Sequence, residues 1–287
     1  MGAPPEISVI VPVYRHWTLV PDLIAALGRQ TIGQDRFEIL LVDNDPAAET
    51  APPALPGNAR ALACAAPGSY AARNVGAASA RGALIVFTDA DCRPDPDWLE
   101  ALREAFRARP DGLLAGPVRM AAPKHLNAFA AYDLVRGIPQ AAYVRRGYAA
   151  TANLAVPATI FRALGGFDAR RFSGGDAEFC RRADAAGHTM ALVPDAPVAH
   201  PCRTGWHEIV TKARRTKGGQ VAAGPLPRRA AWALRTLAPP LRDTLSFLRA
   251  EHPLRHRLAA VAIRQRVWAA ELAETARLLA GGAPERR

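Results

Sequence analysis

The chain has few cysteines and none of the spacings that usually hold a metal or a disulfide framework. Its 287 residues include four cysteines, and no two of them form a Cys-x-x-Cys pair. A zinc knuckle is therefore disfavoured, and so is a small secreted domain stapled by disulfides. We expect four buried free thiols, at Cys64, Cys92, Cys180 and Cys202.

Long apolar runs are lacking as well. No stretch of about 18 consecutive apolar residues occurs, so we expect no transmembrane helix. The opening Met1-Gly2-Ala3-Pro4-Pro5-Glu6 shows neither the basic start and apolar core of a secretory signal nor a myristoylation pattern. The sequence therefore predicts a cytoplasmic protein.

The net charge of +11 comes entirely from the last third of the chain. Residues 1–199 contain 20 Lys plus Arg and 20 Asp plus Glu, whereas residues 200–287 contain 17 basic and 6 acidic residues, an excess of 11. This asymmetry indicates either a region that meets an anionic partner or a helical appendage with solvated arginines. Nucleic acid is a poor fit, because the region lacks interleaved aromatics, a zinc motif and a helix-turn-helix signature.

Strands and helices alternate along the first part of the chain. Residues 7–14 and 37–42 are predicted strands on either side of a helix over 18–30, which makes a right-handed βαβ unit. A loop with a short strand near 61–63 leads to an alanine-rich helix over 69–81. Residues 84–91, which follow this helix, begin with an uninterrupted apolar run and end in two carboxylates, and the run predicts a buried strand. A chain of this length can bury a substantial core, and the order of elements predicts a mainly parallel sheet with helices on both faces.

The rest of the chain continues the pattern and then becomes helical. The sequence predicts a helix over 97–109, a strand over 113–118, an irregular aromatic segment, a segment over 151–157, helices over 157–164 and 177–186, and an edge strand over 193–199.

The basic region begins as a predicted loop. Residues 203–219 contain five basic side chains and end in Gly218-Gly219, and from Arg228 two or three helices follow, broken at Pro239-Pro240 and Pro253. The apolar face of the last helix suits either a membrane interface or packing on protein. Its predicted members are Leu254, Leu258, Val261, Trp268, Leu272 and Leu279.

Two aspartates follow the apolar run that begins at Leu84. Asp89 and Asp91 are separated by one alanine, and the carboxyl edge of an open α/β sheet is where ligands bind. Two hard oxygen donors suit a divalent cation that also holds phosphate oxygens. Exposed turn aspartates are the competing interpretation, because aspartate-rich strand ends followed by proline are common loop chemistry.

A third aspartate opens the helix predicted over 177–186. Gly174 and Gly175 precede Asp176, and a carboxylate at a helix N-terminus is favoured by the helix dipole. Taken by itself, Asp176 is therefore a helix cap.

Six landmarks together resemble the family 2 glycosyltransferases of the GT-A fold, over residues 7 to about 205. They occur in the family's order and spacing, and any one alone would be common. They are Pro12-Val13-Tyr14, Val42-Asp43-Asn44, Ala72-Arg73-Asn74-Val75-Gly76, Asp89-Ala90-Asp91, Asn153-Leu154-Ala155-Val156, and Gly165-Gly166-Phe167-Asp168 followed by an acidic helix start.

This resemblance implies a domain organisation and a nucleotide site. Residues 1–205 would form a GT-A catalytic domain, with a nucleotide-binding half over about 1–95 and an acceptor half over about 96–205. Residues 206–287 would be a basic loop and a helical extension. The nucleotide would be bound by Pro12, Tyr14, Asp43, Arg73 and Asp89.

The resemblance also implies metal ligands and a base. Asp91 and His200 would hold Mn²⁺ or Mg²⁺, with His207 and Cys202 as weaker rivals of the histidine. Asp176 would be the catalytic base, with Glu178 as the weaker candidate. The chain departs from the family where Gly175 stands, because a glutamate is frequent there.

The implied reaction is inverting, metal-dependent transfer from a UDP-, GDP- or dTDP-linked sugar to a saccharide or lipid-linked hydroxyl acceptor. The usual setting of such relatives is bacterial cell-envelope or exopolysaccharide synthesis. The Gln-x-x-Arg-Trp motif of processive synthases is missing, which favours transfer of a single residue. The implied protein is a cytoplasmic enzyme that can touch the inner face of the plasma membrane through its basic C-terminal region and can form a homo-oligomer.

Two alternatives stay open at this point. A sugar-phosphate nucleotidyltransferase shares the α/β architecture, but it needs a glycine-rich loop after the first strand, and Tyr14-Arg15-His16-Trp17 has no glycine. A non-catalytic, anion-binding relative of a glycosyltransferase is the other alternative, because the glutamate expected at position 175 is missing.

Overall fold

The computed structural model describes residues 4–45, 47 and 52–285, so the expectations for the first three residues and for 48–51 lie outside it. Two compact units make up the chain. We call them the sheet unit, which comprises Met1–Arg119, Ile138–Arg170 and Gly175–His200, and the helical unit, which comprises Met120–Gly137, Arg171–Gly174 and Pro201–Arg287.

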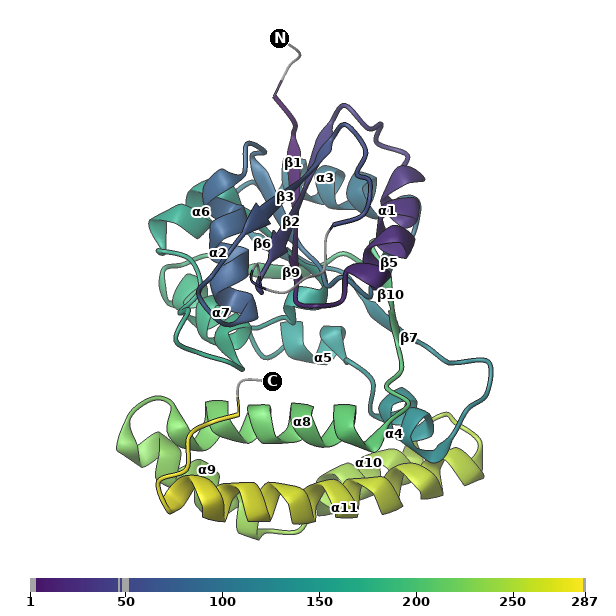
Figure 1. The fold of residues 1–287 in the computed structure, drawn as a ribbon, viewed down its shortest axis with the longest axis vertical. Coiled ribbons are helices and arrows are strands. Elements are labelled where there is room, and N and C mark those ends of the chain that lie inside the picture. Colours follow the sequence, from purple (N-terminus) through teal and green to yellow (C-terminus); the bar gives the residue numbers. More distant parts are fainter. Residues whose placement is uncertain (1–3, 46, 48–51, 286–287) are drawn as a thin grey trace. The chain divides into compact units, whose positions relative to one another are not determined.

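The sheet unit contains a seven-stranded sheet in the order β3-β2-β1-β4-β8-β6-β9 (Figure 1). β8 runs antiparallel to β4 and β6, and the other pairs are parallel, which confirms the mainly parallel sheet. The strands are β1 (Ile7–Val13), β2 (Phe37–Asp43), β3 (Ala59–Ala63), β4 (Leu84–Phe87), β6 (Leu113–Ala115), β8 (Leu154–Pro157) and β9 (Met190–Leu192).

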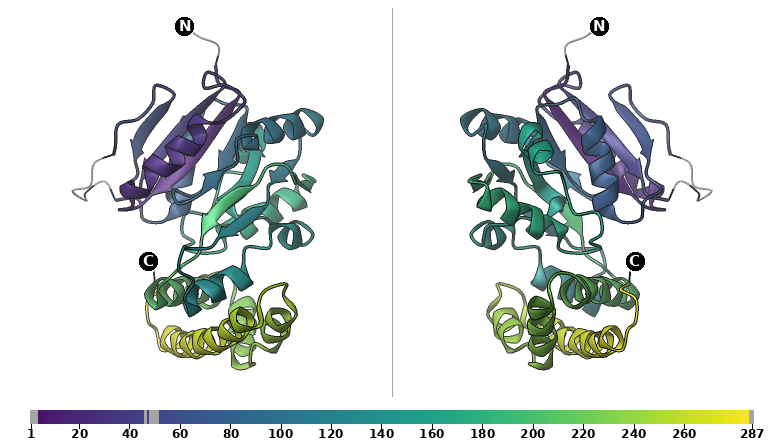
Figure 2. Two further views of the ribbon diagram at one scale, coloured as in Figure 1. Left: turned by 90° about the vertical axis from the view of Figure 1, so that its right-hand side faces the viewer. Right: turned by 90° about the vertical axis from the view of Figure 1, so that its left-hand side faces the viewer.

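Helices cover both faces of this sheet, as expected (Figures 1 and 2). One face packs on the 3₁₀ turn η1 (Trp17–Leu19), on α1 (Val20–Gly28) and on α3 (Trp98–Ala108). The other face packs on α2 (Ser69–Ser79), α6 (Ala158–Ala163) and α7 (Gly175–Ala185). Alternation along β1 creates the two cores, because Val9 and Val11 enter the first and Ile10 enters the second.

A smaller sheet has the order β5-β10-β7, formed by β5 (Arg93–Pro94), β10 (Val198–Pro201) and β7 (Val118–Ala121). The strand predicted over 113–118 is therefore divided between β6 and β7. The aromatic segment predicted to be irregular contains α4 (Ala128–Arg136) and α5 (Gln140–Val144), and η2 (Thr151–Asn153) precedes β8. All four cysteines are buried and free, as expected.

The helical unit has a core of its own, separate from the two cores on the sheet. α4 contributes Tyr132, whose ring centroid lies 6.1 Å from that of Phe247, and Ile209, Ala213, Ala260, Ile263 and Val267 complete the cluster. Its other helices are α8 (Trp206–Lys217), the π-helical turn η3 (Gly218–Ala222), α9 (Leu226–Leu237), α10 (Leu241–Arg249) and α11 (Leu254–Leu279). In the ranges that the structure describes, no helix combines the length and apolar character needed to cross a bilayer.

The structure corrects two predictions for this region. Residues 206–217 form helix α8 instead of a mobile loop, because Glu208 accepts hydrogen bonds from the amides of Thr204 and Gly205 and Ile209 and Ala213 are buried. The predicted apolar face of the last helix is correct only in part: Val261 packs on the core of the helical unit, and Trp268 and Leu272 are partly buried. Leu254, Leu258 and Leu279 are exposed, whereas Ala260, Ile263, Val267 and Leu278 point inward.

Candidate active site at the carboxyl edge of the sheet

Strands β1, β2 and β4 end at one edge of the sheet, and the predicted site residues gather there. The register pairs Val13 with Asp43 and Ile10 with Phe87, so the segments after the three strands are neighbours. β4 ends at Phe87, and Asp89 and Asp91 therefore lie in the turn beyond it. A carboxylate oxygen from each aspartate and the Cys92 sulfur lie within 4.8 Å of one another.

His200 reaches the same turn through strand pairing. β10 runs antiparallel to β5, with Ala199 opposite Arg93, which brings His200 beside the residues just before Arg93. Its Nε2 lies 3.7 Å from Oδ2 of Asp91, and the imidazole is buried. The structure thus brings together the two residues predicted to bind a metal.

The rival ligands are less suitable. His207 is an exposed residue in the first turn of α8. Cys202 is buried in the helical unit, and burial raises the pKa of its thiol to about 11. Cys92 is fully buried, and burial, followed by the charges of Asp89 and Asp91, raises the pKa of its thiol well above the usual range. Both thiols are therefore protonated at neutral pH.

The donor set fits a divalent cation. The partly exposed carboxylates of Asp89 and Asp91 lie together, and the His200 imidazole lies beside Asp91. Hard oxygen donors with a borderline nitrogen suit Mn²⁺ and Mg²⁺, Mn²⁺ better because of the imidazole.

Arg73 holds Asp89 from the side of α2. Its Nη2 lies 2.5 Å from Oδ1 of Asp89, and its guanidinium carbon lies 5.7 Å from the centroid of the Tyr70 ring. Arg73 is only 3% exposed, and its Nε has no hydrogen-bond partner among the residues that the structure describes. A buried donor without a partner beside an acidic turn is a feature of a site that receives a polar ligand.

Tyr70 contacts the start of α7. A Cβ built on Gly175 would lie 2.7 Å from Cε2 of the Tyr70 ring, which is too close for any side chain. Burial raises the pKa of the Tyr70 hydroxyl, and the charge of Asp176 raises it further, so Asp176 lies close to this ring. In the observed packing of α2 against α7, position 175 therefore has no room for a glutamate side chain.

Asp176 lies in the first turn of α7, and its Oδ1 accepts a hydrogen bond from the amide of Ala177 at 2.8 Å. Glu178 is engaged elsewhere, because its Oε1 lies 2.7 Å from Nε of Arg182, which also donates to the carbonyls of Leu164 and Gly166. Of the two acids, Asp176 is the one that lies next to Tyr70 of α2.

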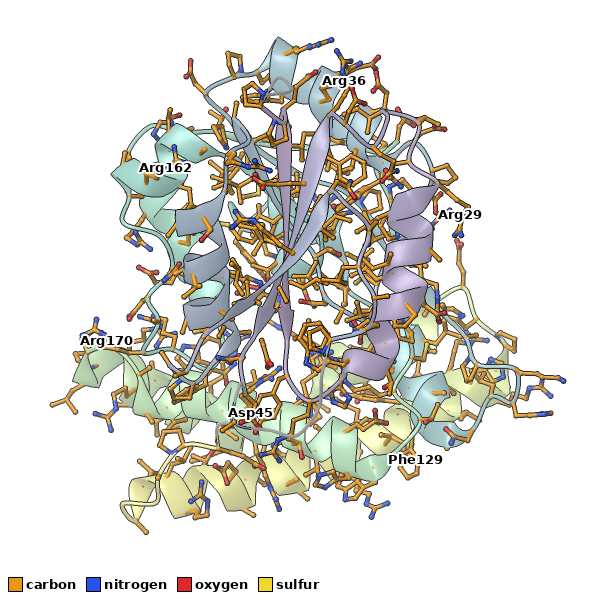
Figure 3. The ribbon with its side chains drawn as sticks, turned by 45° about the horizontal axis from the view of Figure 1, so that its top comes forward. Arg29, Arg36, Asp45, Phe129, Arg162 and Arg170 are labelled. Atoms are coloured by element: carbon orange, nitrogen blue, oxygen red, sulfur yellow. The ribbon has the colours of Figure 1, made fainter. Side chains whose placement is uncertain are left out.

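The predicted nucleoside residues border the ends of β1 and β2. Pro12 pairs with Val42 in the register, and Asp43 Oδ1 accepts a hydrogen bond from the Asp45 amide at 3.0 Å. Figure 3 labels Asp45 at this end of the strands. Pro12, Tyr14 and Asp43 are all partly exposed and thus accessible to a ligand.

Two residues at this edge were given no role from the sequence. Arg15 has a φ of 58°, lies 5.1 Å from the centroid of the Tyr14 ring and forms an ion pair with Asp45 at 2.5 Å. Asn44 is buried, donates to the carbonyls of Cys64 and Ala66 and accepts from the Gly68 amide, which fixes the loop before α2. Asn44 belongs to the Val-Asp-Asn landmark, whereas nothing in the sequence marks Arg15.

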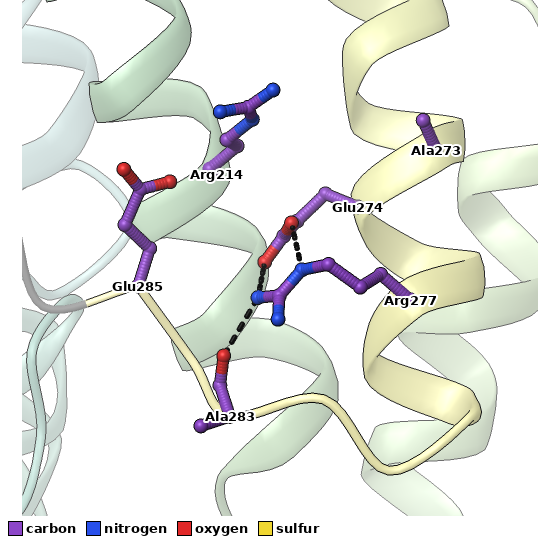
Figure 4. Close-up of a pocket in the computed structure, with 6 residues that line it drawn as sticks. All are labelled: Arg214, Ala273, Glu274, Arg277, Ala283 and Glu285. Atoms are coloured by element: carbon purple, nitrogen blue, oxygen red, sulfur yellow. Dashed lines mark hydrogen bonds and ion pairs between the residues drawn. The ribbon is translucent and has the colours of Figure 1, made fainter.

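A hollow of about 430 Å³ lies elsewhere, within the helical unit (Figure 4). Glu274 and Arg277 on its wall form an ion pair of 2.6 Å, and Arg277 also donates to the Ala283 carbonyl. Its charges thus neutralise each other, and it holds none of the predicted site residues.

Comparison with known proteins identifies the family. The family described as "Glycosyl transferase family 2" matches residues 8–153. Glycosyltransferase AglE of Haloferax volcanii is 31% identical over 231 residues, which are 78% of this chain and 76% of that protein. The chain belongs to glycosyltransferase family 2. It is a glycosyltransferase, as expected.

Other relatives of this family 2 glycosyltransferase agree. The pre-mycofactocin glycosyltransferase of Mycobacterium tuberculosis is 29% identical over 163 residues, which are 54% of this chain and 34% of that protein. The mannosyltransferase PcManGT from Pyrobaculum calidifontis, solved with GDP-Man and Mn²⁺, has a TM-score of 0.58 at 16% identity and is matched over 96% of this chain and 89% of its own.

S. aureus TarS, solved with UDP-GlcNAc, has a TM-score of 0.56 at 17% identity, over 91% of this chain and 72% of the solved chain. At these identities the two solved structures establish the fold, and the GT-A expectation is confirmed.

Proposed function

We propose that this glycosyltransferase moves a sugar, with inversion, from a nucleoside-diphosphate donor to a hydroxyl acceptor and depends on a divalent metal. One observation carries the proposal: α2 meets both acidic sites. Arg73 of α2 binds Asp89, and Tyr70, one turn earlier, packs against Gly175 beside Asp176. The proposed metal-binding turn and the proposed base therefore border one helix of the sheet unit.

Asp91 and His200 are the proposed metal ligands. When bound, the cation would neutralise the charge that develops on the departing diphosphate. Asp89 is bound to Arg73 through one oxygen, so we assign Asp89 and Arg73 to the nucleotide. The buried guanidinium lowers the electrostatic cost of bringing a phosphate-bearing ligand to an acidic turn.

Asp176 is the proposed catalytic base. An acceptor hydroxyl is a weak nucleophile near neutral pH, and a carboxylate within hydrogen-bond reach would take its proton as the new bond forms. A metal on the leaving-group side and a base on the acceptor side imply a single displacement at the anomeric carbon. An α-linked donor would then give a β-linked product.

Pro12, Tyr14 and Asp43 are proposed to hold the nucleoside. The partly exposed carboxylate of Asp43 at the end of β2 can accept a hydrogen bond from a base, and the Tyr14 ring offers an apolar surface. The solved relatives hold UDP-GlcNAc and GDP-Man, and we propose a UDP-, GDP- or dTDP-linked donor here.

The proposed setting is cell-envelope or exopolysaccharide synthesis in the cytoplasm, with a saccharide or lipid-linked acceptor and peripheral contact with the inner membrane face through the basic C-terminal region. Homo-oligomer formation stays a prediction, as does the division of residues 1–205 into nucleotide and acceptor halves. Family membership sets aside the nucleotidyltransferase alternative. Turnover in the donor screen below distinguishes the proposed enzyme from the non-catalytic alternative.

The test is a donor screen over UDP-, GDP- and dTDP-sugars, with Mn²⁺, with Mg²⁺ and with a chelator. We expect turnover of one donor class only with the cation, and NMR of the product should show an inverted anomeric centre. Asp91→Asn should abolish the cation dependence together with the activity. The exposed Asp111→Asn is the matched control and should retain both. Full activity in the chelator, or a retained anomeric configuration, would contradict the proposal.

A further inference from the structure

The helical unit leaves an unusual number of leucines in solvent. Among the described residues, ten large hydrophobic side chains are exposed; Leu19 is one of them, and the other nine lie between Leu226 and Leu279. Six of the nine belong to α9 and α10, with exposed fractions from 37% to 73%, and we call them the leucine face. They are Leu226, Leu234 and Leu237 on α9 and Leu241, Leu245 and Leu248 on α10.

The spacing of these leucines makes a stripe on each helix. Leu241, Leu245 and Leu248 occur at i, i+4 and i+7, and Leu226, Leu234 and Leu237 occur at i, i+8 and i+11, with the exposed Ala230 between the first two. Phe247 and Thr236 are the buried residues of the two helices. The amphipathic pattern is therefore reversed, because the leucines point to solvent instead of to the core of the helical unit.

Cationic side chains accompany the leucine face. Arg235, Arg242 and Arg249 are exposed on the same two helices. Arg242 and Arg249 line a hollow of about 590 Å³ with Leu245, Ser246, Ala250 and Glu251. Each guanidinium group can bind two oxygens of a phosphate at once. Two such groups beside an apolar side chain therefore suit a ligand in which a phosphate is attached to a hydrocarbon.

Charge decides which partner fits this surface. Residues 200–287 carry 17 basic and 6 acidic residues, so two copies meeting through the leucine face would bring like charges together. An anionic phospholipid surface offers headgroup phosphates for the arginines and an acyl boundary for the leucines. Helices of 12 and 9 residues are too short to span the bilayer and suit a position in its interface.

We propose that the leucine face docks in the interface of an anionic phospholipid bilayer, with Arg242 and Arg249 on headgroup phosphates. The inference deepens the membrane contact of the proposed function and moves it from α11, where the sequence suggested it, to α9 and α10. Transfer chemistry does not depend on it, because the proposed catalytic and binding residues belong to the sheet unit.

The test is flotation of the full chain with vesicles of phosphatidylcholine alone or with about one third phosphatidylglycerol. We expect binding to the anionic vesicles only, and weaker binding as salt rises. Leu241→Ser/Leu245→Ser/Leu248→Ser should lower the vesicle affinity about tenfold or more. Leu19→Ser and Leu279→Ser remove exposed leucines outside the leucine face and should leave the affinity unchanged.

A second pair of variants tests the charge requirement. Arg242→Gln/Arg249→Gln should weaken binding and reduce its salt dependence, whereas Arg29→Gln/Arg109→Gln removes the same charge from exposed sites of the sheet unit and should do neither. Figure 3 labels Arg29, the residue directly after the C-terminal end of α1. Donor-dependent turnover in detergent-free buffer should be equal in all variants, which separates failure of the docking proposal from failure of the transferase proposal.

Three outcomes would overturn the docking proposal. The first is absence of the native chain from the floated anionic vesicles. The second is equal vesicle binding by the serine variant and the native chain. The third is a dimer in sedimentation velocity that the serine variant abolishes, because a second copy would then cover the leucine face.

Discussion

The sheet unit and the helical unit differ in how many of their large apolar side chains are exposed, because the described residues include one in the sheet unit and nine in the helical unit. In the sheet unit, strands β1, β2 and β4 are buried on both faces, and Arg73 and Arg81 form ion pairs with Asp89 and Glu38. In the helical unit, leucines and arginines share the exposed surface of α9 and α10. The first arrangement stabilises a fold around a site, and the second leaves a surface whose apolar area is favourable only against a partner.

Leucine substitutions give the largest expected contrast between the units. Leu23 of α1 is fully buried, and Leu23→Ala should lower the free energy of unfolding by about 2–5 kcal/mol through lost burial and a cavity. Leu245→Ala on the leucine face should change it by less than about 0.5 kcal/mol. Urea unfolding of both variants measures the difference, and equal losses would show that α10 is packed in solution.

Gly175→Ala sharpens the comparison within the sheet unit. The new methyl group would meet the Tyr70 ring at 2.7 Å, and such overpacking should cost about 1–3 kcal/mol of unfolding free energy. Gly28→Ala is the matched control, because nothing lies within 4 Å of its Cβ position. Gly175→Ala should lower the free energy of unfolding by less when Tyr70→Ala is also present. If the losses of the two single variants simply add in the double variant, the proposed contact is contradicted.

Acid titration tests the buried charge of the helical unit. Burial would raise the pKa of Asp133, but the charge and the amide of Arg203, together with the charges of Lys212 and Arg136, outweigh burial and hold the pKa below its usual value. A lowered folded-state pKa adds stability above the unfolded-state value, and that stability is lost as pH falls through the folded-state value. Unfolding free energy should therefore fall as pH drops below about 4.

Nη1 of Arg203 lies 3.1 Å from Oδ2 of Asp133. The variant Arg203→Gln removes the positive charge of this side chain. The acid-dependent loss of unfolding free energy should be smaller in this variant, because the Arg203 charge lowers the pKa of Asp133. Exposed Arg249→Gln should leave the acid slope as it is. If unfolding free energy falls equally with pH in the native chain and in Arg203→Gln, the ion pair of Arg203 with Asp133 is not the cause of the acid-dependent loss.

Local patterns were sufficient for the framework of the sheet unit. β-branched runs and their order along the chain predicted the parallel strands, and the Asp-x-Asp landmark with His200 predicted two side chains that the structure places 3.7 Å apart. These features depend on residues close in sequence or on a known order of landmarks. The contact of Tyr70 with Gly175 joins α2 to α7 across about one hundred positions of sequence, so no local pattern could reveal it.

The helical unit was harder to predict for a physical reason. The predicted loop contains five basic residues, yet Ile209 and Ala213 within it are buried in α8. Gly218-Gly219, which follow α8, belong to a π-helical turn. α11 packs through Ala260, Ile263 and Val267, while its larger Leu254 and Leu258 are exposed. A rule that places the largest apolar residues inside selects the wrong face when a surface is apolar.

The most direct test of the account compares turnover and donor binding in Asp176→Asn. If Asp176 is the base of a site shared with Asp91, turnover should fall about 10²- to 10⁴-fold while calorimetry gives an unchanged donor affinity in the presence of Mn²⁺. Asp184→Asn, exposed on the same helix, should behave as the native chain. Undiminished turnover in Asp176→Asn would contradict the account.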